Sequence, residues 1–224
     1  MKPSTLIVPT LNEAENIKRL IPLLSRLYPK LYILIVDDGS RDGTLEAVKR
    51  LAKQYERLSF IDRKNAKCKG LSISVLAGLK QVKTPNFAVM DADFQHPPEK
   101  LGELLNALEY HDLAIGTRSA TPGWKFSRKW ISKIANLAAS LRLKLSGNPY
   151  VKDPMSGFFA ARLSVVKALL SKNPRGFKIL FDILKRLPKS TKVVQIGFVF
   201  ALRKAGKSKL SVNQCKAFLK ALFS

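Results

Sequence analysis

Apolar residues in the first half of the chain alternate between a spacing typical of buried strands and one typical of amphipathic helices. Short β-rich runs predict strands at residues 4–8, 32–36, 58–61, 87–90 and 113–116. Apolar residues three and four positions apart predict helices at residues 12–27, 44–54, 71–82 and 98–110. This alternation predicts an α/β fold, with a mostly parallel central sheet flanked by helices on both faces.

The second half continues the pattern less regularly. Its spacing predicts helices at residues 127–145, 163–170 and 177–187, and strands at 157–160 and 193–201. The helix at 127–145 carries tryptophan beside lysine and arginine, a composition typical of helices that lie in a membrane interface. The alternative, which does not exclude the first interpretation, is a surface helix that packs on the sheet through its Ile and Leu stripe. Residues 211–224 form a basic amphipathic tail suited to a membrane surface or a partner helix.

Charge is divided unevenly between the two halves. Residues 1–112 carry 17 basic and 14 acidic side chains, net +3, whereas residues 113–224 carry 23 basic and 2 acidic side chains, net +21. A half that is nearly free of acids indicates a surface facing something strongly anionic, such as nucleic acid, anionic lipid headgroups or phosphorylated substrates.

Two further features bear on location. Cys68 and Cys215 lie far apart and outside any metal-binding spacing, which favours a reduced, cytoplasmic setting. The sequence shows no signal peptide and no run of about 20 apolar residues that would span a membrane. We therefore expect a soluble or peripheral protein without a transmembrane helix.

Polar residues follow three of the predicted strands at the point where each strand ends. These polar groups are residues 9–13, 37–40 and 91–93. Ligands of open parallel sheets bind at the carboxyl ends of the strands, so we expect these groups to share one site. Asn12 and Asp42 are suited to cap helices. The aspartates at positions 37, 38, 91 and 93 are more acids than capping alone requires.

The step Asp91-Ala92-Asp93 indicates a site for a divalent cation that carries phosphates, because two carboxylates at one strand end point toward one bound object. Asp93 and Gln95 offer oxygen ligands of the kind that Mg²⁺ or Mn²⁺ prefers. There is no G-x-G-x-x-G after the first strand and no Walker lysine loop, which disfavours dinucleotide and P-loop sites. A nucleoside diphosphate held in this way suggests transfer of the group attached to it.

Several segments, in the right order, resemble the family 2 glycosyltransferases of the GT-A fold and, within them, the dolichol-phosphate mannosyltransferases (polyprenyl-phosphate-mannose synthases). The resemblance extends from about residue 5 to residue 210. The matching segments are 8–13 (VPTLNE), 36–44 (VDDGSRDGT), 69–71 (KGL), 91–99 (DADFQHPPE), 116–118 (GTR), 153–159 (DPMSGFF), 176–178 (GFK) and 203–210 (RKAGKSKL).

This resemblance implies inverting, metal-dependent transfer of mannose from GDP-mannose to a polyprenyl (dolichyl) phosphate. It implies that the guanosine is lined by Pro9, Leu11, Glu13, Val36 and Asp38. It implies that Asp91, Ala92 and Asp93 meet the ribose and diphosphate, with Asp93, Gln95 and Asp91 as the metal-binding residues. The residues expected to contact donor or acceptor phosphates are Arg118, Lys178, Arg203 and Lys209. The catalytic roles are expected at Asp91, Asp93, Arg118 and Arg203.

A lipid phosphate is already an anion near neutral pH, so it needs positioning and charge screening more than a general base. We therefore expect no dedicated catalytic base, and Asp91 is the weaker candidate for one. Gln195-Ile196-Gly197 departs from the Glu-Val-Pro common in the family, and Asp182 stands where Glu is usual.

The expected organisation is one GT-A catalytic domain over residues 1–210, with a nucleotide-sugar half (1–116) and a membrane-facing acceptor half (117–210), before the tail at 211–224. The expected partners are the donor, the lipid acceptor, an anionic membrane surface on its cytoplasmic face and a small integral membrane subunit, but no nucleic acid.

Three alternatives remain open from the sequence. A polyprenyl-phosphate hexosyltransferase that uses a UDP-sugar such as UDP-glucose would carry similar motifs. A nucleic-acid-binding protein would use the basic half electrostatically, although carboxylates at the strand ends would repel phosphate without a metal. A catalytically silent scaffold is disfavoured by the retained acids and cations.

Overall fold

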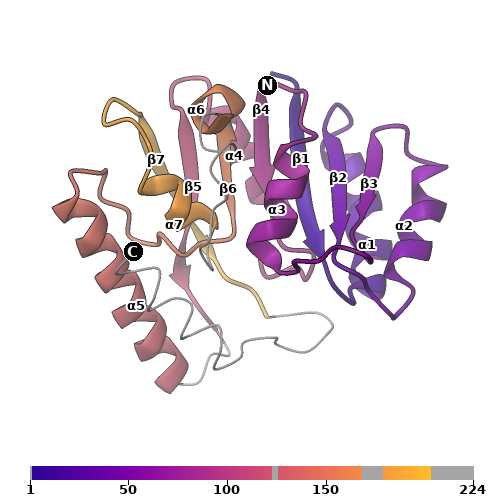
Figure 1. Cartoon of the computed structure of the whole chain (residues 1–224), viewed down its shortest axis with the longest axis horizontal. Helices are drawn as coiled ribbons and strands as arrows, with labels where there is room; N and C mark the ends of the chain where they lie inside the picture. Colours follow the sequence, from indigo (N-terminus) through magenta and orange to yellow (C-terminus); the bar gives the residue numbers. More distant parts are fainter. Residues whose placement is uncertain (1, 123–125, 168–178, 203–224) are drawn as a thin grey trace.

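The computed structural model describes residues 2–122, 126–167 and 179–202. Within these residues, seven strands form one sheet in the order β3-β2-β1-β4-β6-β5-β7 (Figure 1). The strands are β1 (Ser4–Thr10), β2 (Tyr32–Asp37), β3 (Leu58–Asp62), β4 (Asn86–Val89), β5 (Leu113–Ala120), β6 (Phe159–Arg162) and β7 (Val193–Val199). The α/β class and the mostly parallel sheet expected from the sequence are confirmed.

Helices cover both faces of this sheet. The described helices are α1 (Ala14–Leu27), α2 (Thr44–Ala52), α3 (Leu71–Leu79), the 3₁₀ turn η1 (Pro98–Lys100), α4 (Leu101–Ala107), α5 (Phe126–Leu145), α6 (Leu163–Lys167) and α7 (Ile179–Leu184). Alternate strand residues point into two separate cores. One core packs against α1, α2 and α4, and the other against α3, α5, α6 and α7. Central strands such as β1 are buried on both faces, which explains their unbroken apolar runs.

The direction of the strands decides where a site can form. Strand β6 runs antiparallel to both of its neighbours, β4 and β5, whereas β5 pairs with β7 in parallel and β4 pairs with β1 in parallel. Two reversals cancel, so β5 and β7 run in the same direction as β1, β2 and β4. The carboxyl ends of all these strands therefore lie along one edge of the sheet, the lower edge in Figure 1.

Several element boundaries differ from the sequence prediction. The predicted helix at 98–110 is a 3₁₀ turn followed by the short α4, since Pro97-Pro98 imposes a tight start. Strand β5 runs four residues beyond the predicted end at Gly116 because β7 pairs with it as far as Ala120. The expected division into halves after residue 116 thus falls inside a strand. The predicted tail at 211–224 lies outside the described residues.

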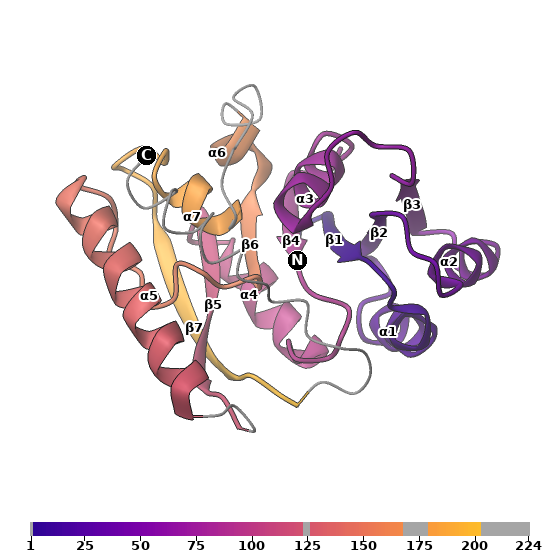
Figure 2. The ribbon, with the colours of Figure 1, turned by 60° about the horizontal axis from the view of Figure 1, so that its bottom comes forward.

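Helix α5 lies at the outer edge of the molecule, beside β5 and β7 (Figure 2). Among the side chains of this helix that the structure describes, those of Ala139 and Leu143 enter the apolar core. The Ile and Leu stripe faces away from the sheet, with exposed fractions of 65% at Ile131, 61% at Ile134 and 54% at Leu141. The alternative in which this stripe docks α5 on the sheet is therefore wrong. Among the described helices, none is both long enough and apolar enough to cross a membrane.

Candidate active site

The loops that follow β1 and β2 are tied to each other by hydrogen bonds. The Asn12 backbone N–H donates to Ser40 Oγ at 2.8 Å, and the Arg41 N–H donates to Asn12 Oδ1 at 2.8 Å. The Glu13 N–H donates to Thr44 Oγ1 at 2.9 Å. These contacts hold the first two polar strand ends at a fixed distance. Asn12 therefore links two loops, a role different from the helix cap suggested by the sequence.

Asp42 caps two helices at once. Its carboxylate accepts the Ala14 N–H at 3.0 Å, at the start of α1, and the Thr44 N–H at 3.1 Å, at the start of α2. Partial burial acts to raise the pKa of Asp42, but the hydrogen bonds from Thr44 and Ala14 outweigh it and lower that pKa below its ordinary 3.8. The capping role expected for Asp42 is confirmed.

Asp37 stabilises the turn after β2. Its carboxylate accepts the Ser40 N–H at 3.1 Å and the Ser40 hydroxyl at 2.6 Å, and the residue is 1% exposed. Burial raises the pKa of Asp37, with the Ser40 hydrogen bonds opposing that effect. The inward direction of this side chain leaves Asp38 as the acid at this strand end that meets the neighbouring loop.

Asp38 lies beneath the loop that leads into α3. Its Oδ2 accepts the Gly70 N–H at 2.6 Å, while its Oδ1 lies 3.6 Å from Arg63 Nη1 and is buried without a hydrogen-bond partner. Gly39 has a φ of 88°, and a Cβ there would lie 2.7 Å from Lys69 Nζ, so only glycine suits this turn. A buried carboxylate oxygen with no donor is a strong acceptor for a ligand N–H or O–H.

The other residues expected around the base occupy different environments. Pro9 is half-buried and Leu11 is 36% exposed, while the Glu13 carboxylate accepts a hydrogen bond from Asn16 Nδ2 at 2.7 Å. Val36 and Ala92, at 0% and 2% exposure, are core residues. Their side chains therefore do not line a site, and any ligand contact there is restricted to the backbone. The expected contacts of these two residues with the donor stay a prediction and would involve the backbone.

The acid loop, residues 91–96 after β4, has a strained turn at its centre. Phe94 has a φ of 63°, an unusual value for a bulky side chain, and is 7% exposed. The turn brings the Gln95 N–H to Asp93 Oδ1 at 3.1 Å, and Gln95 Nε2 donates to the Ala201 carbonyl at 3.2 Å. Such a conformation costs of order 1–3 kcal/mol and persists where the surroundings enforce it, as they often do at functional sites.

The residues proposed as metal ligands offer the oxygen atoms that a hard divalent cation prefers, but they are too few to complete its coordination. Asp91, Asp93 and Gln95 supply carboxylate and amide oxygens, the donors that Mg²⁺ and Mn²⁺ prefer. In the described part of the chain, no group of three or more His, Cys, Asp or Glu side chains is arranged to hold a metal. A cation here would complete its coordination with phosphate oxygens and water, as Mg²⁺ commonly does.

Arg118, near the end of β5, connects this acid loop to the acid-poor half. Its Nε and Nη2 donate to the Asp153 carboxylate at 2.6 and 2.7 Å, and the Arg118 and Asp153 side chains are 16% and 6% exposed. Arg118 and Asp91 both line a small cavity of about 70 Å³. The structure thus brings together the expected residues from β4 and β5.

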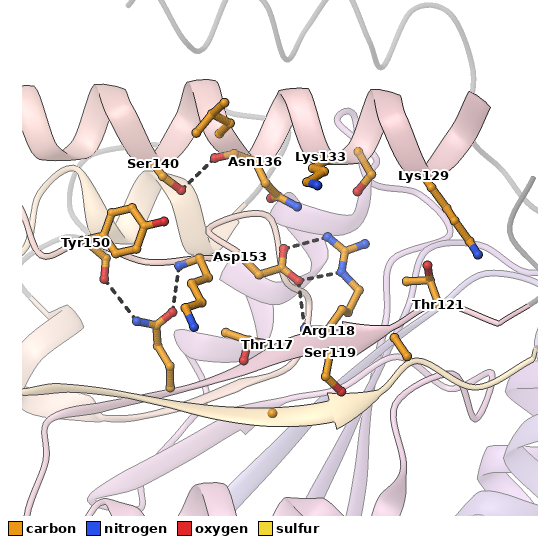
Figure 3. A pocket seen from close by; sticks show the side chains of 16 residues that line it. Thr117, Arg118, Ser119, Thr121, Lys129, Lys133, Asn136, Ser140, Tyr150 and Asp153 are labelled. Atoms are coloured by element: carbon orange, nitrogen blue, oxygen red, sulfur yellow. Dashed lines mark hydrogen bonds and ion pairs between the residues drawn. The ribbon is translucent and has the colours of Figure 1, made fainter. Parts of the chain in front are cut away.

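A larger cavity of about 770 Å³ opens on the other side of Arg118, between α5 and strands β5 and β7 (Figure 3). Four cationic side chains line it and face a single acid, Asp153; they are Arg118, Lys129, Lys133 and Lys152. Lys129, Lys133, Asn136 and Ser140 lie on one face of α5. Sequence reasoning missed these residues as a site, although their spacing of three and four is a polar helical stripe.

A family model of known sequences matches the chain over residues 5–170, under the description glycosyl transferase family 2. The chain belongs to glycosyl transferase family 2. The match covers the acid loop, Arg118 and all of α5.

Curated relatives extend the similarity over nearly the whole of this family 2 chain. It is 40% identical to a dolichol-phosphate mannosyltransferase of Pyrococcus furiosus, over 98% of this chain and 62% of that protein. It is 35% identical to the Saccharomyces cerevisiae dolichol-phosphate mannosyltransferase, over 97% of this chain and 85% of that protein. It is 32% identical to a polyprenol monophosphomannose synthase of Mycolicibacterium smegmatis, over 92% and 80%. The chain thus spans less than two thirds of the Pyrococcus relative.

Solved structures confirm the fold. Glucosyl-3-phosphoglycerate synthase of Mycobacterium tuberculosis, determined with Mn²⁺, UDP and glucosyl-3-phosphoglycerate, matches with a TM-score of 0.69 and 18% identity, over 99% of this chain and 77% of that chain. At this identity the similarity concerns the fold, which is the GT-A arrangement expected from the sequence.

Two residues at which the sequence of this family 2 chain departs from the expected pattern, Gln195 and Gly197, lie in the floor of the large cavity. Gln195 Oε1 accepts the Lys152 N–H at 2.7 Å and its Nε2 donates to the Tyr150 carbonyl at 3.2 Å, so both ends of the amide are used. A glutamate could not make the second bond, which explains glutamine here. Gly197, also in the floor, leaves space, since a Cβ there would meet only Ser119 Cβ at 4.0 Å.

Three expected phosphate contacts, Lys178, Arg203 and Lys209, lie outside the described residues. Asp182, another departure from the family pattern, is 4% exposed in α7, where Lys185 Nζ lies 3.8 Å from its carboxylate.

Proposed function

We propose that the chain transfers mannose from GDP-mannose to the phosphate of a polyprenol, with inversion at the sugar carbon and with a divalent cation. The names of relatives at 32–40% identity support the sugar and the lipid acceptor. The observation that carries the proposal is the position of Arg118, which lies between the acid loop and a cavity lined by cations. Two phosphate-bearing substrates would meet on its two sides.

The donor would lie along the ends of β1, β2 and β4. Asp38 Oδ1, buried and without a hydrogen-bond partner, would accept an N–H of the base. Lys69 Nζ lies beside the Gly39 backbone in that turn, where a Cβ would meet it at 2.7 Å. Asp93 and Gln95 would hold a divalent cation, which neutralises charge on the departing diphosphate when it is bound. The acid loop by itself would repel the diphosphate, so we expect donor binding to depend on the cation.

The acceptor phosphate would lie in the large cavity, where lysines 129, 133 and 152 and Arg118 outnumber the single acid Asp153. Its volume of about 770 Å³ suits a phosphate, the first isoprene units and part of the sugar. Arg118 keeps its guanidinium directed by Asp153, so its remaining N–H groups have a fixed direction. Positioning and charge screening of this kind replace a general base.

The transfer itself requires one bond to form and one to break. A phosphate oxygen of the acceptor attacks the anomeric carbon of mannose, and the bond from that carbon to the diphosphate oxygen breaks. The electron pair leaves on GDP. No proton has to move when the attacking phosphate oxygen is already anionic, which agrees with the arginine and lysine lining of the acceptor side.

The outer face of α5 supports a peripheral position on a membrane. Trp130, Ile131, Ile134, Leu141 and Leu145 are between 50% and 77% exposed along this helix. Leu137, 66% exposed, lies at the border of this face and also lines the cavity. A helix whose apolar face points outward, while lysines on its other face line the cavity, suits the interface of an anionic bilayer. In that position the cavity would open beside the membrane that holds the acceptor.

The donor can be tested by thermal stabilisation, since a ligand that binds the folded state raises the melting temperature. GDP, UDP, GDP-mannose and UDP-glucose are compared, each with and without Mn²⁺ or Mg²⁺. We expect shifts with GDP and GDP-mannose that increase with the cation, followed by transfer of radiolabelled mannose to a polyprenyl phosphate. A shift with UDP and UDP-glucose alone would contradict GDP-mannose as the donor and favour the hexosyltransferase that uses a UDP-sugar. No shift with any nucleotide would contradict the transferase proposal.

A further inference from the structure

His96 belongs to the acid loop, yet the proposed binding of metal, base and phosphate assigns it no part. The residue is 2% exposed, and its ring is enclosed by three phenylalanine rings. The ring stacks on Phe158 with 5.1 Å between centroids and 11° between planes, and meets the edges of Phe198 and Phe200 at 5.7 and 5.5 Å. A polar ring in such surroundings needs a defined hydrogen bond to offset the loss of water.

That hydrogen bond comes from the backbone of Asp91. The Asp91 N–H donates to His96 Nδ1 at 3.1 Å. A backbone N–H can only donate, so Nδ1 bears no proton and the ring proton is on Nε2. Asp91 Oδ2 lies 3.7 Å from the same nitrogen. This distance is too long for a hydrogen bond, and Nδ1 has no proton to donate to the carboxylate. The ring therefore fixes the Asp91 backbone, and the contact between the two side chains is not an ion pair.

The same ring is confined from behind. A Cβ at Gly157 would lie 3.4 Å from His96 Cε1 and 3.5 Å from Asp91 Oδ2, so the backbone of Gly157 closes over both residues. Gly157 and Phe158 follow Asp153, which directs Arg118, and Phe198 and Phe200 lie at the end of β7. His96 thus connects three parts of the site. These are the start of the acid loop, the segment that positions Arg118, and the end of β7.

We propose that His96 is a positioning residue for the transfer reaction: its Nδ1 fixes the Asp91 backbone, and its ring locks the acid loop to the segments before β6 and at the end of β7. The inference rests on the proposed function, because it assigns His96 a part in that reaction. The strained turn at Phe94 supports it, since a conformation of this cost needs fixed surroundings. Without the Nδ1 acceptor, the Asp91 N–H at the start of the acid loop would lose its hydrogen bond. The carboxylates of Asp91 and Asp93 would then no longer be held in one orientation.

Substitutions of His96 test the contribution of the Nδ1 hydrogen-bond acceptor separately from that of the aromatic ring. His96→Phe keeps an aromatic ring and removes the acceptor, whereas His96→Asn removes the ring and keeps an acceptor atom at the position of Nδ1. His96→Gln places its amide at the position of Nε2. The matched control is His111→Phe, because His111 is the other histidine of the chain and its Nδ1 bonds Ala107 O on α4, away from the acid loop.

Partners that orient metal ligands from behind typically change metal affinity or activity by roughly 10- to 100-fold. We expect His96→Phe to lower kcat and the affinity for Mn²⁺ in the presence of GDP by about 10-fold or more, and His96→Asn to recover part of both. If His96→Phe does not fold, the activities of His96→Asn and His96→Gln test the proposal instead. We expect His96→Asn to be the more active of the two. Wild-type turnover in His96→Phe, or equal losses in Asn and Gln, would overturn the proposal.

A spectroscopic measurement separates this inference from the proposed function. The ¹⁵N NMR shift of Nδ1 in histidine-labelled protein should show an unprotonated, hydrogen-bonded nitrogen at His96, assigned by the loss of the His111 signal in His111→Phe. A protonated Nδ1 would overturn the inference even if transfer is observed. An unprotonated Nδ1 in a protein that transfers no sugar would refute the proposed function and leave the hydrogen bond to Asp91 intact.

Discussion

The Arg118 guanidinium makes two hydrogen bonds to the Asp153 carboxylate, at 2.6 and 2.7 Å, and Asp153 also accepts the Arg118 backbone N–H at 3.3 Å. A two-point pair of this kind fixes the plane of a guanidinium as well as its position. Arg118 lines both the small cavity at Asp91 and the large cavity under α5. The direction that Asp153 gives to Arg118 therefore bears on both proposed phosphate sites.

Removal of the Asp153 charge tests this relationship. In Asp153→Asn the largely buried Arg118 loses its counter-charge, and breaking such pairs costs about 3–5 kcal/mol, which denaturant unfolding would report. We expect Asp153→Asn to lower the rate of mannose transfer by at least about 10-fold, measured under conditions where the variant is folded, with partial recovery in Asp153→Glu. Asp112→Asn is the control, since Asp112 pairs with Arg162 at 3.3 Å at the opposite end of β5. Equal activity losses in both variants would contradict a special role for Asp153.

Asp93→Asn tests the proposed cation site. The amide keeps the shape of the carboxylate and its contact with the Gln95 N–H, so we expect the melting temperature without ligands to change little. Metal-dependent turnover should fall to background, and Mn²⁺ should no longer increase the thermal shift produced by GDP. Glu103→Gln, in the exposed pair with Lys100, is a control for loss of one negative charge. Normal turnover in Asp93→Asn would refute its role as a ligand.

The double cap made by Asp42 predicts a pH-dependent stability. Because the pKa of Asp42 is lowered in the folded state, its contribution is present above the ordinary value of 3.8 and is lost as pH falls through the lower folded-state pKa. Loss of a cap typically costs about 1 kcal/mol per helix end. We expect Asp42→Ala to lower the free energy of unfolding by about 1–2 kcal/mol at pH 7, and the difference to shrink below pH 3.8. A difference that is independent of pH would exclude the charged cap.

The outward apolar stripe of α5 predicts membrane association without a cost to folding. Ile134 and Leu141 are 61% and 54% exposed, so Ile134→Gln with Leu141→Gln should leave the melting temperature nearly unchanged. Sedimentation with anionic vesicles should fall, because each buried side chain of this size contributes about 1.5–3 kcal/mol. Tyr110→Gln, at a residue 73% exposed near the end of α4, is the control. Unchanged sedimentation of the double variant would place the membrane contact elsewhere.

The acid loop shows how far sequence reasoning reaches. The spacing of Asp91, Asp93 and Gln95 after an apolar run placed a polar site at the carboxyl end of β4, because strand direction and side-chain type are local properties. The burial of Val36 and Ala92 could not be read from the motifs that contain them. Whether a side chain at a strand end faces a ligand or the core depends on the helix packed over it. Gly78 of α3, for example, would bring a Cβ within 3.2 Å of Val36 Cγ2.

Helix α5 shows the opposite limit. Its periodicity predicted a helix and its composition suggested a membrane interface, but an apolar stripe packs equally well against a sheet or a bilayer. Only the placement of Ala139 and Leu143 in the core shows that the Ile and Leu stripe faces outward. The polar stripe with Lys133 and Asn136 gained its meaning in the same way, since it closes a cavity only once β5 and β7 lie beneath it.

The sequence by itself determined the α/β class, the strand-end acids and the excess of cations in the second half, because periodicity, turn chemistry and charge are carried by neighbouring residues. The tertiary structure decided which of those groups meet. Strand β6 reverses direction between β4 and β5, so the ends of distant strands come to one edge, where Arg118 bonds Asp153 and lines one cavity with Asp91. Such contacts join residues far apart in the chain, and their geometry is set by how the sheet and helices pack together.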